Sequence, residues 1–213
     1  MGSARPDGHP AAHADPPPSV AEELERWLAD PGTRTLDSLI EVFAEKSFAL
    51  PFVVLLGVPA LPLPTGGVTH VFEVIAMLLA AQLIAGAGRP WLPERWRALE
   101  LAGPRSERFI AGLMRLIRRL ERLSRPRLRF LFGHRASNVA FGLLVLGGSL
   151  GAFLAPPFSG LDTLPALGVV GLSLGVLLED ALVVAGAILV GAAGVALEIV
   201  LGRAALSGIE SIF

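Results

Sequence analysis

The chain has 213 residues, of which 53% are hydrophobic and 17% are charged, and its net charge is −1. Soluble domains carry about a quarter charged residues, so this composition excludes an ordinary water-soluble domain. The length leaves no room for a separate soluble enzyme beside a membrane part. The absence of cysteine excludes disulfides, thiolate metal sites and thiol nucleophiles. We therefore expect one all-α integral membrane module.

The first 46 residues are predicted to precede the membrane part. Residues 1–18 are rich in Pro, Ala, His and Asp and lack the apolar core of a secretory signal, which predicts a disordered tail without a cleavable leader. Residues 19–46 predict two amphipathic surface helices, the first with the capping-box spacing of Ser19 and Glu22. Thr35 is placed to cap the second helix. Their apolar stripes are Val20, Leu24, Trp27 and Leu28, then Leu36, Leu39, Ile40 and Phe43.

Residues 47–88 are predicted to form a first membrane hairpin. Glu73 is their only charged residue, and prolines and glycines at positions 59–67 divide the segment into two apolar arms. A straight helical crossing needs roughly 20 apolar residues, and each arm has about 15 to 20. The hairpin is therefore expected either to cross fully, with its turn outside, or to be re-entrant.

Residues 89–135 form an arginine-rich segment with 13 Arg and four Glu. Leu113, Leu116 and Leu120 lie on one predicted helix face and arginines on the other, which indicates an interfacial helix. Such basic connections are enriched in the cytoplasm. Nucleic-acid binding is disfavoured because no recognition motif accompanies the stripe. The residues expected to contact the interface and lipid phosphates are Arg89, Trp91, Arg115, Arg119 and Arg122.

Residues 136–178 repeat the hairpin design, with Pro156, Pro157 and Gly160 at the predicted turn. Such internal repeats are typical of small membrane carriers. Residues 179–213 add a C-terminal membrane helix, whose uncharged part is Ala181–Leu197. Glycines four residues apart predict close helix packing within the chain, with a homo-oligomer as the alternative. These pairs are Gly147 with Gly151 and Gly171 with Gly175.

Polar residues inside the apolar segments are the candidate site residues, because ionisable groups in a membrane mark pathways or paired sites. His70 and Glu73 can share a helix face, either as an interfacial pair at the turn or as a metal or proton pair. The amide of Gln82 needs a hydrogen-bond partner, and the acids that end the second hairpin can also simply face water. The hypothetical ligand-binding residues are Gln82, Asp162, Thr163, Glu179 and Asp180.

Catalytic motifs do not emerge from the sequence. It contains no glycine-rich phosphate loop, no Ser-His-Asp order, no Asp-x-Asp pair and no His-Glu-x-x-His. We therefore expect a non-enzymatic protein without catalytic residues, cofactor, metal site or nucleic-acid partner.

Several short elements between about residues 35 and 200 resemble the bacterial exopolysaccharide-synthesis family called ExoD. The first is Leu61-Pro62-Leu63-Pro64 with Gly66, followed by Gln82 and Gly86. The most specific is Arg89-Pro90-Trp91-Leu92-Pro93, because a tryptophan between prolines suits a stiff interfacial turn. The remaining elements are Glu121-Arg122, Arg125-Pro126-Arg127, Thr163-Leu164-Pro165-Ala166, Gly175 and Leu178-Glu179-Asp180. The chain departs from the family pattern at Asp162, where an amide is expected, and at Ala181, where glycine is expected.

The resemblance implies a multi-pass protein of the bacterial inner membrane that is needed for exopolysaccharide production. It implies no reaction. A carrier for a lipid-linked or anionic intermediate is our first hypothesis, and a membrane scaffold that docks polysaccharide-synthesis enzymes is the second. The expected partners are membrane lipids and, for the scaffold, polysaccharide-synthesis proteins.

Overall fold

The computed structural model describes residues 19–30, 34–42, 48–61, 68–98, 104–123, 134–156 and 159–210. Within these ranges the chain is helical and has no strand, which confirms the all-α prediction. The predicted tail and Phe43 lie outside the described residues. The helices are α1 (Val20–Ala29), α2 (Leu36–Val42), α3 (Ala49–Gly57), α4 (Val68–Ala85), α5 (Glu94–Arg97), α6 (Pro104–Leu123), α7 (Arg135–Leu154), α8 (Thr163–Leu177) and α9 (Ala181–Glu210).

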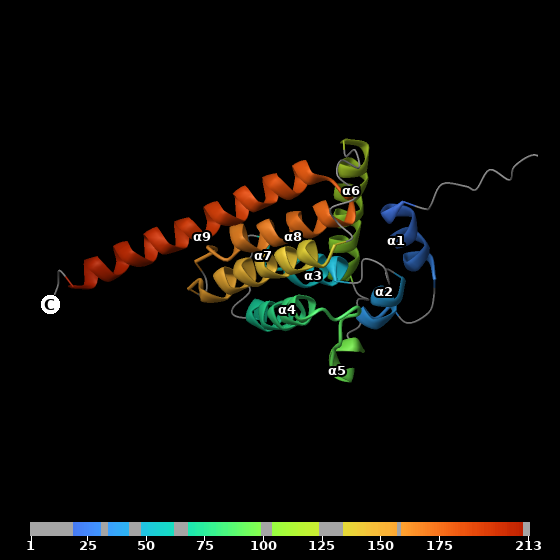
Figure 1. The fold of residues 1–213 in the computed structure, drawn as a ribbon, viewed down its shortest axis with the longest axis horizontal. Coiled ribbons are helices and arrows are strands. Elements are labelled where there is room, and N and C mark those ends of the chain that lie inside the picture. Colours follow the sequence, from blue (N-terminus) through green and yellow to red (C-terminus); the bar gives the residue numbers. More distant parts are fainter. Residues whose placement is uncertain are drawn as a thin grey trace, which may run out of the picture.

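Five apolar helices, α3, α4, α7, α8 and α9, form an elongated bundle (Figure 1). α8 packs along α9, α3 and α7, and α4 packs mainly along α7. Eight of the nine residues of α3 are buried, and α8 is buried over much of its length. Both helices lack charged residues, so they can fill the interior while the longer helices surround them.

The directions of α4 and α7 give the bundle two distinct ends. The ring of His70, early in α4, lies 5.2 Å from that of Phe153, late in α7. At the opposite end, a Cβ built on Gly142 would lie 2.7 Å from the side chain of Ile84. The two helices are therefore antiparallel. The end at which α4 and α8 begin is here called the turn end, and the end at which α7 and α9 begin is called the arginine end.

Glycine brings α8 and α9 into close contact. A Cβ on Gly168 would lie only 2.4 Å from the Cα atom of Gly191, so position 168 has no room for a side chain at this crossing. The predicted packing within the chain is confirmed at Gly151, Gly171 and Gly175, which approach Val195, Ala187 and Val184 respectively. Gly147 instead faces open space.

Helices α1, α2 and α6 lie together at the arginine end (Figure 1). The predicted capping box of α1 is present, and Leu24 and Trp27 are buried as its stripe predicts. The indole of Trp27 donates a hydrogen bond to Ser38 Oγ at 3.0 Å, which joins α1 to α2. On α6 the predicted stripe is partly wrong. Leu113 is buried, but Leu116 is 41% exposed, and the buried face is completed by Met114 and Ile117.

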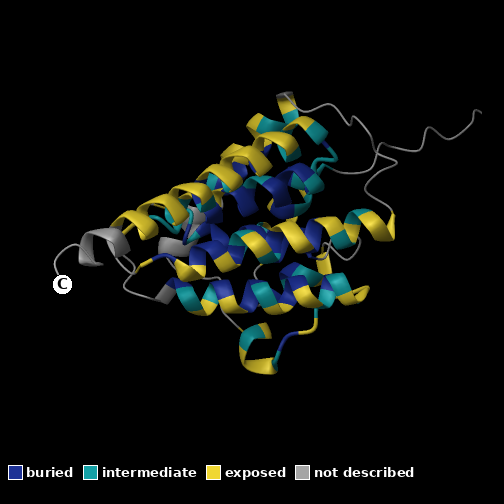
Figure 2. Cartoon of the chain, turned by 60° about the vertical axis from the view of Figure 1, so that its left-hand side comes forward, coloured by how far each residue is buried: buried dark blue, intermediate teal, exposed yellow. Residues whose placement is uncertain are grey.

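Two described helices are long and apolar enough to cross a membrane. These are Arg135–Leu154, with a mean hydropathy of 1.7, and Ala181–Ala204, with a mean hydropathy of 2.3. Only 11% of the latter window is buried, whereas the core helix of a soluble protein is mostly buried. Figure 2 shows exposed residues along the length of α9. This helix continues to Glu210, beyond the uncharged part that ends at Leu197.

Candidate functional site

The turn end contains a buried carboxyl group in contact with a histidine. Nδ1 of His70 lies 2.8 Å from Oε2 of Glu73, one helical turn apart on α4. The pair was anticipated from the spacing of the two residues. Glu73 has 0% exposure, whereas His70 keeps 30% of its side chain exposed. The carboxylate therefore belongs to the interior of the bundle.

Two further carboxylates lie near this pair. Asp162 directly precedes α8, and its charge interacts with those of both Glu73 and Glu198. Glu198 comes from α9, and a Cβ on Gly151 would lie 3.4 Å from its Oε2 atom. The missing side chain of Gly151 thus gives the Glu198 carboxylate room beside α7. Three helices contribute acids to one region.

Several polar atoms in this part of the bundle have no hydrogen-bond partner among the described residues. They include Oε1 of Glu73, Oε1 of Glu198 and the hydroxyl of Ser149, all of them buried. Buried polar atoms are normally paired, so these atoms identify a polar region within the apolar bundle. The described residues contain no group of three or more His, Asp or Glu that is suited to hold a metal ion.

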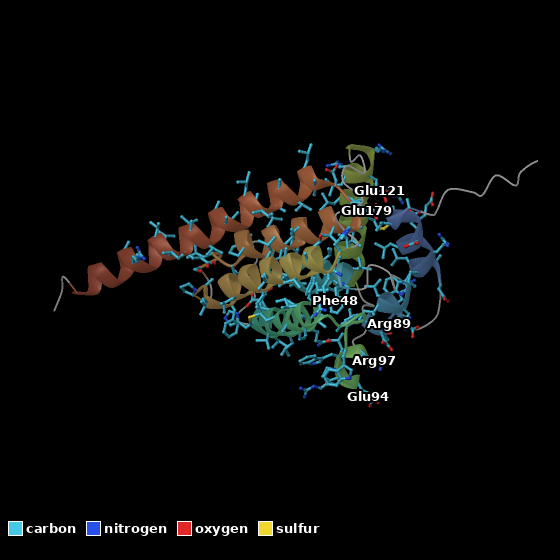
Figure 3. All side chains as sticks on the ribbon, in the orientation of Figure 1. Phe48, Arg89, Glu94, Arg97, Glu121 and Glu179 are labelled. Carbon is cyan, nitrogen blue, oxygen red and sulfur yellow. The ribbon has the colours of Figure 1, made fainter. Side chains whose placement is uncertain are left out.

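The hypothetical ligand-binding residues are divided between the two ends. Asp162 and Thr163 lie at the turn end, whereas Gln82, Glu179 and Asp180 lie at the arginine end (Figure 3 labels Glu179). The intervening helix α8 has 15 residues, which at 1.5 Å per residue is about 22 Å. These residues therefore do not form one ligand site.

Gln82 holds the proline-flanked tryptophan turn in place. Its Nε2 donates to the backbone oxygen of Trp91 at 2.9 Å, and its Oε1 accepts from the backbone N–H of Trp91 at 2.7 Å. The side chain thus pairs with one residue as a neighbouring strand would. Trp91 is thus the hydrogen-bond partner that the amide of Gln82 was predicted to need. The two bonds position the indole of Trp91, which is 71% exposed.

Glu179 and Asp180 reverse the chain between α8 and α9. Glu179 has a φ of 54°, in the left-handed region that non-glycine residues rarely adopt. Asp180 is 2% exposed, and its Oδ1 accepts from the backbone N–H of Leu182 at 2.8 Å. This bond caps the start of α9. The acid that was expected to face water is therefore buried at the chain reversal.

Most of the residues proposed for lipid contact lie exposed at the arginine end. Arg115, Arg119 and Arg122 are exposed on α6, and Arg89 is exposed before α5 (Figure 3). Other charges at this end hold the helices together. The carboxylate of Asp37 on α2 accepts hydrogen bonds from both Nε and Nη2 of Arg97 at 2.8 Å, and this pairing raises the pKa of Arg97. The basic surface is thus built on a braced layer of helices.

Glu198 and Ser149 were not among the residues selected from the sequence. Glu198 directly follows the uncharged stretch Ala181–Leu197, and Ser149 is one serine in a long apolar helix. Their proximity to the buried Glu73 region depends on how α4, α7 and α9 pack. The sequence signal for Glu198 is its position directly after the uncharged stretch Ala181–Leu197.

A protein-family model described as "Exopolysaccharide synthesis, ExoD" matches residues 20–200. "Protein ExoD" of Rhizobium meliloti is 34% identical over 177 residues, covering 79% of this chain and 71% of that protein. The chain belongs to the ExoD family. An "uncharacterized protein slr1875" of Synechocystis is also similar, with 29% identity over 167 residues, 77% of this chain and 78% of that protein. No solved structure matches the chain. The family places this ExoD protein in exopolysaccharide synthesis.

Proposed function

We propose that this ExoD protein is a multi-pass protein of the bacterial inner membrane that carries an anionic, lipid-linked intermediate of exopolysaccharide synthesis and catalyses no reaction itself. The observation that carries the proposal is the pairing of an apolar bundle surface with an exposed basic layer at one end. Lipid-linked sugar intermediates combine an apolar chain with a phosphate group, so they match both surfaces.

The apolar surface supports a position in the bilayer. Large apolar side chains are exposed on four helices of the bundle, and contiguous exposure of this kind is unusual for a soluble monomer. On α9 they include Leu182 at 63% and Leu189 at 71%. On α7 they include Leu143 at 54% and Leu154 at 69%, and on α4 Val71 at 55%. Lipid chains would cover these side chains without cost.

The distribution of charge favours the arginine end as the binding region for the anionic group. Arg115, Arg119 and Arg122 are exposed there, and guanidinium groups bind phosphate oxygens through paired donors. The turn end carries Glu73, Asp162 and Glu198, which would repel an anion. We therefore expect a phosphate headgroup to bind beside α6 while its lipid chain follows the outside of the bundle.

A triple substitution on α6 tests this proposal. Arg115→Gln, Arg119→Gln and Arg122→Gln together remove three phosphate donors, each contributing about 1 kcal/mol near an anionic surface. Binding of a short-chain isoprenyl diphosphate to the detergent-purified protein should weaken about 100-fold, and polymer output should fall at equal membrane abundance. Arg203→Gln, an exposed arginine of α9, is the matched control. Unchanged binding and output in the triple variant would contradict the carrier role.

The orientation in the bilayer is a separate part of the proposal. The basic end is expected on the cytoplasmic side. The ends at which α4 and α8 begin then face away from the cytoplasm. Thr65→Cys and Ser159→Cys place single thiols in these connections, because the native chain has no cysteine. Labelling of both by an impermeant reagent from outside the cell supports full crossing. Protection of both from that side supports re-entrant hairpins.

A scaffold that docks synthesis enzymes is the alternative, and the layer of α1, α2 and α6 favours it as a docking platform. Ala21 donates its backbone N–H to Oε1 of Glu121 at 3.2 Å, and Arg118 pairs with Glu25, so α1 is part of this layer. Deletion of residues 1–18 leaves these contacts intact and tests docking by the tail. Lost co-purification of polysaccharide-synthesis proteins would favour the scaffold, and retained co-purification together with retained output would disfavour tail docking.

A further inference from the structure

We propose that Glu73, Asp162 and Glu198 form a proton-binding site at the turn end of the bundle. The site would hold one exchangeable proton inside the bundle. This inference goes beyond the carrier role, because it concerns the opposite end of the molecule and does not depend on what binds at the arginine end.

The first argument is the charge of the cluster. The charges of Glu73 and Glu198 each interact with that of Asp162, and they also interact with one another. Three carboxylates in an apolar bundle repel one another, and ionised groups are costly to bury. Protonation of one of the acids relieves this repulsion. A bound proton therefore lowers the electrostatic energy of the cluster.

The second argument is the hydrogen bonding of Glu73. Its Oε2 contacts His70, but its Oε1 has no partner among the described residues although the side chain is fully buried. An ionised carboxylate can only accept hydrogen bonds, whereas a protonated one can also donate. A proton on the cluster thus turns one of the acids into a donor to another acid or to a buried hydroxyl.

Ser149 supplies that hydroxyl, and its burial without a hydrogen-bond partner is evidence independent of the acids. Ser149 has 0% exposure and its Oγ has no hydrogen-bond partner in the described part of the chain. It lies one turn before Phe153, whose ring contacts His70, and two turns after Gly142, which packs on Ile84. It therefore shares the face of α7 that packs on α4. The antiparallel register of α7 and α4 places Ser149 level with Glu73.

Neighbouring charges do not neutralise the cluster. α3 has no charged residue, α7 has none after Arg135 at its other end, and α8 has none at all. The connecting residues 62–67 and 157–158 also contain no ionisable group. On α9 the nearest base is Arg203, which is exposed and is turned about 140° from Glu198 at 100° per residue. Among the described residues, His70 is thus the one base that faces the three acids.

Access for a proton is also available. His70 and Glu198 are half-buried, whereas Glu73 is completely buried. A proton that reaches His70 from the turn end can therefore pass to the interior acid Glu73 across their 2.8 Å contact.

Infrared spectroscopy of the full-length protein in lipid nanodiscs tests the inference directly. A protonated carboxyl group gives a carbonyl band that is separate from the bands of carboxylates and that shifts in D₂O. The wild-type protein should show this band near neutral pH, and the double variant Glu73→Gln/Glu198→Gln should lose it. Absence of the band from the wild-type protein would overturn the proposal without recourse to any variant.

Matched controls separate the site from the rest of the chain. Glu25→Gln/Glu94→Gln removes two exposed acids at the arginine end and should leave the band unchanged. The three tryptophans also lie at that end, so unchanged tryptophan emission shows that the variants retain that region. Ser149→Ala should shift the band in frequency while keeping its area. Loss of the band when sodium replaces choline at equal ionic strength would show a cation site and overturn the proton assignment.

Discussion

The two ends of the bundle use charge in opposite ways. At the arginine end the charged groups are mostly exposed, and the ion pairs join surface helices, as between Arg97 and Asp37 or Arg118 and Glu25. At the turn end Glu73 is fully buried, and several polar atoms have no hydrogen-bond partner among the residues that the structure describes. The first arrangement gives a braced basic surface, whereas the second gives an interior that can exchange a proton.

The comparison indicates where substitutions will matter. An exposed ion pair contributes little because water already solvates both charges, whereas a group packed inside the bundle has no solvent to replace its lost contacts. The three tryptophans lie at the arginine end. Their fluorescence therefore reports on that end alone, and circular dichroism reports on the whole helical bundle.

The largest effect is expected from Gly168→Val, which tests whether the two ends are independent. A side chain at this position would overlap the backbone of Gly191 and push α9 off α8, which we expect to cost about 3 kcal/mol. Thermal unfolding followed by circular dichroism should show the loss, with little change in tryptophan emission before unfolding. Gly186→Val is the matched control because nothing lies within 4 Å of that glycine. Equal stability of both variants would contradict the close α8–α9 contact.

A smaller effect is expected from Gln82→Ala, which releases the tryptophan turn at the arginine end. The variant loses two hydrogen bonds to Trp91, and we expect a destabilisation of about 1–2 kcal/mol. In a Trp27→Phe/Trp96→Phe background, the emission of Trp91 should change while the carboxyl band of the turn end stays unchanged. A Gln82→Glu variant keeps the acceptor for the Trp91 N–H and should recover part of the loss.

The smallest effect is expected from Arg118→Gln, which removes an exposed ion pair with Glu25. Both side chains are about half exposed, at 55% and 45%, so the loss should be about 0.2–1 kcal/mol and should shrink as salt is added. Unfolding of the purified protein at low and high ionic strength measures it. A salt-independent loss of several kcal/mol would show that this end is not as solvated as the comparison requires.

The helices and their caps were accessible from the sequence because they depend on local patterns. Ser19 and Glu22 make both bonds of the predicted capping box, and Thr35 Oγ1 accepts from the backbone N–H of Ser38 as expected of a cap. The family was also evident from short elements. The rotation of the α6 face was missed because Met114 and Ile117 are selected by the layer beneath them and not by spacing alone.

The candidate site was less accessible, because its parts come from distant helices. The sequence identified Glu73 with His70 as a pair and Asp162 as a polar departure, but nothing in the spacing relates them to Glu198 or Ser149. It also grouped Gln82 with Asp162, although α8 separates the ends on which they lie. Which polar residues meet is decided by the antiparallel register of α4, α7 and α9.

The length of α9 has a consequence for the surrounding lipid. Its 30 residues extend about 45 Å at 1.5 Å per residue, whereas a hydrocarbon core is about 30 Å thick. α8 ends and α9 begins at the same chain reversal, so the surplus length of α9 lies at the turn end of the bundle. Arg203 lies in this extension, beyond Glu198. Hydrophobic mismatch then couples bilayer thickness to the tilt of this one helix. Because Glu198 is part of α9, the depth of the acidic site would follow the thickness of the membrane around it.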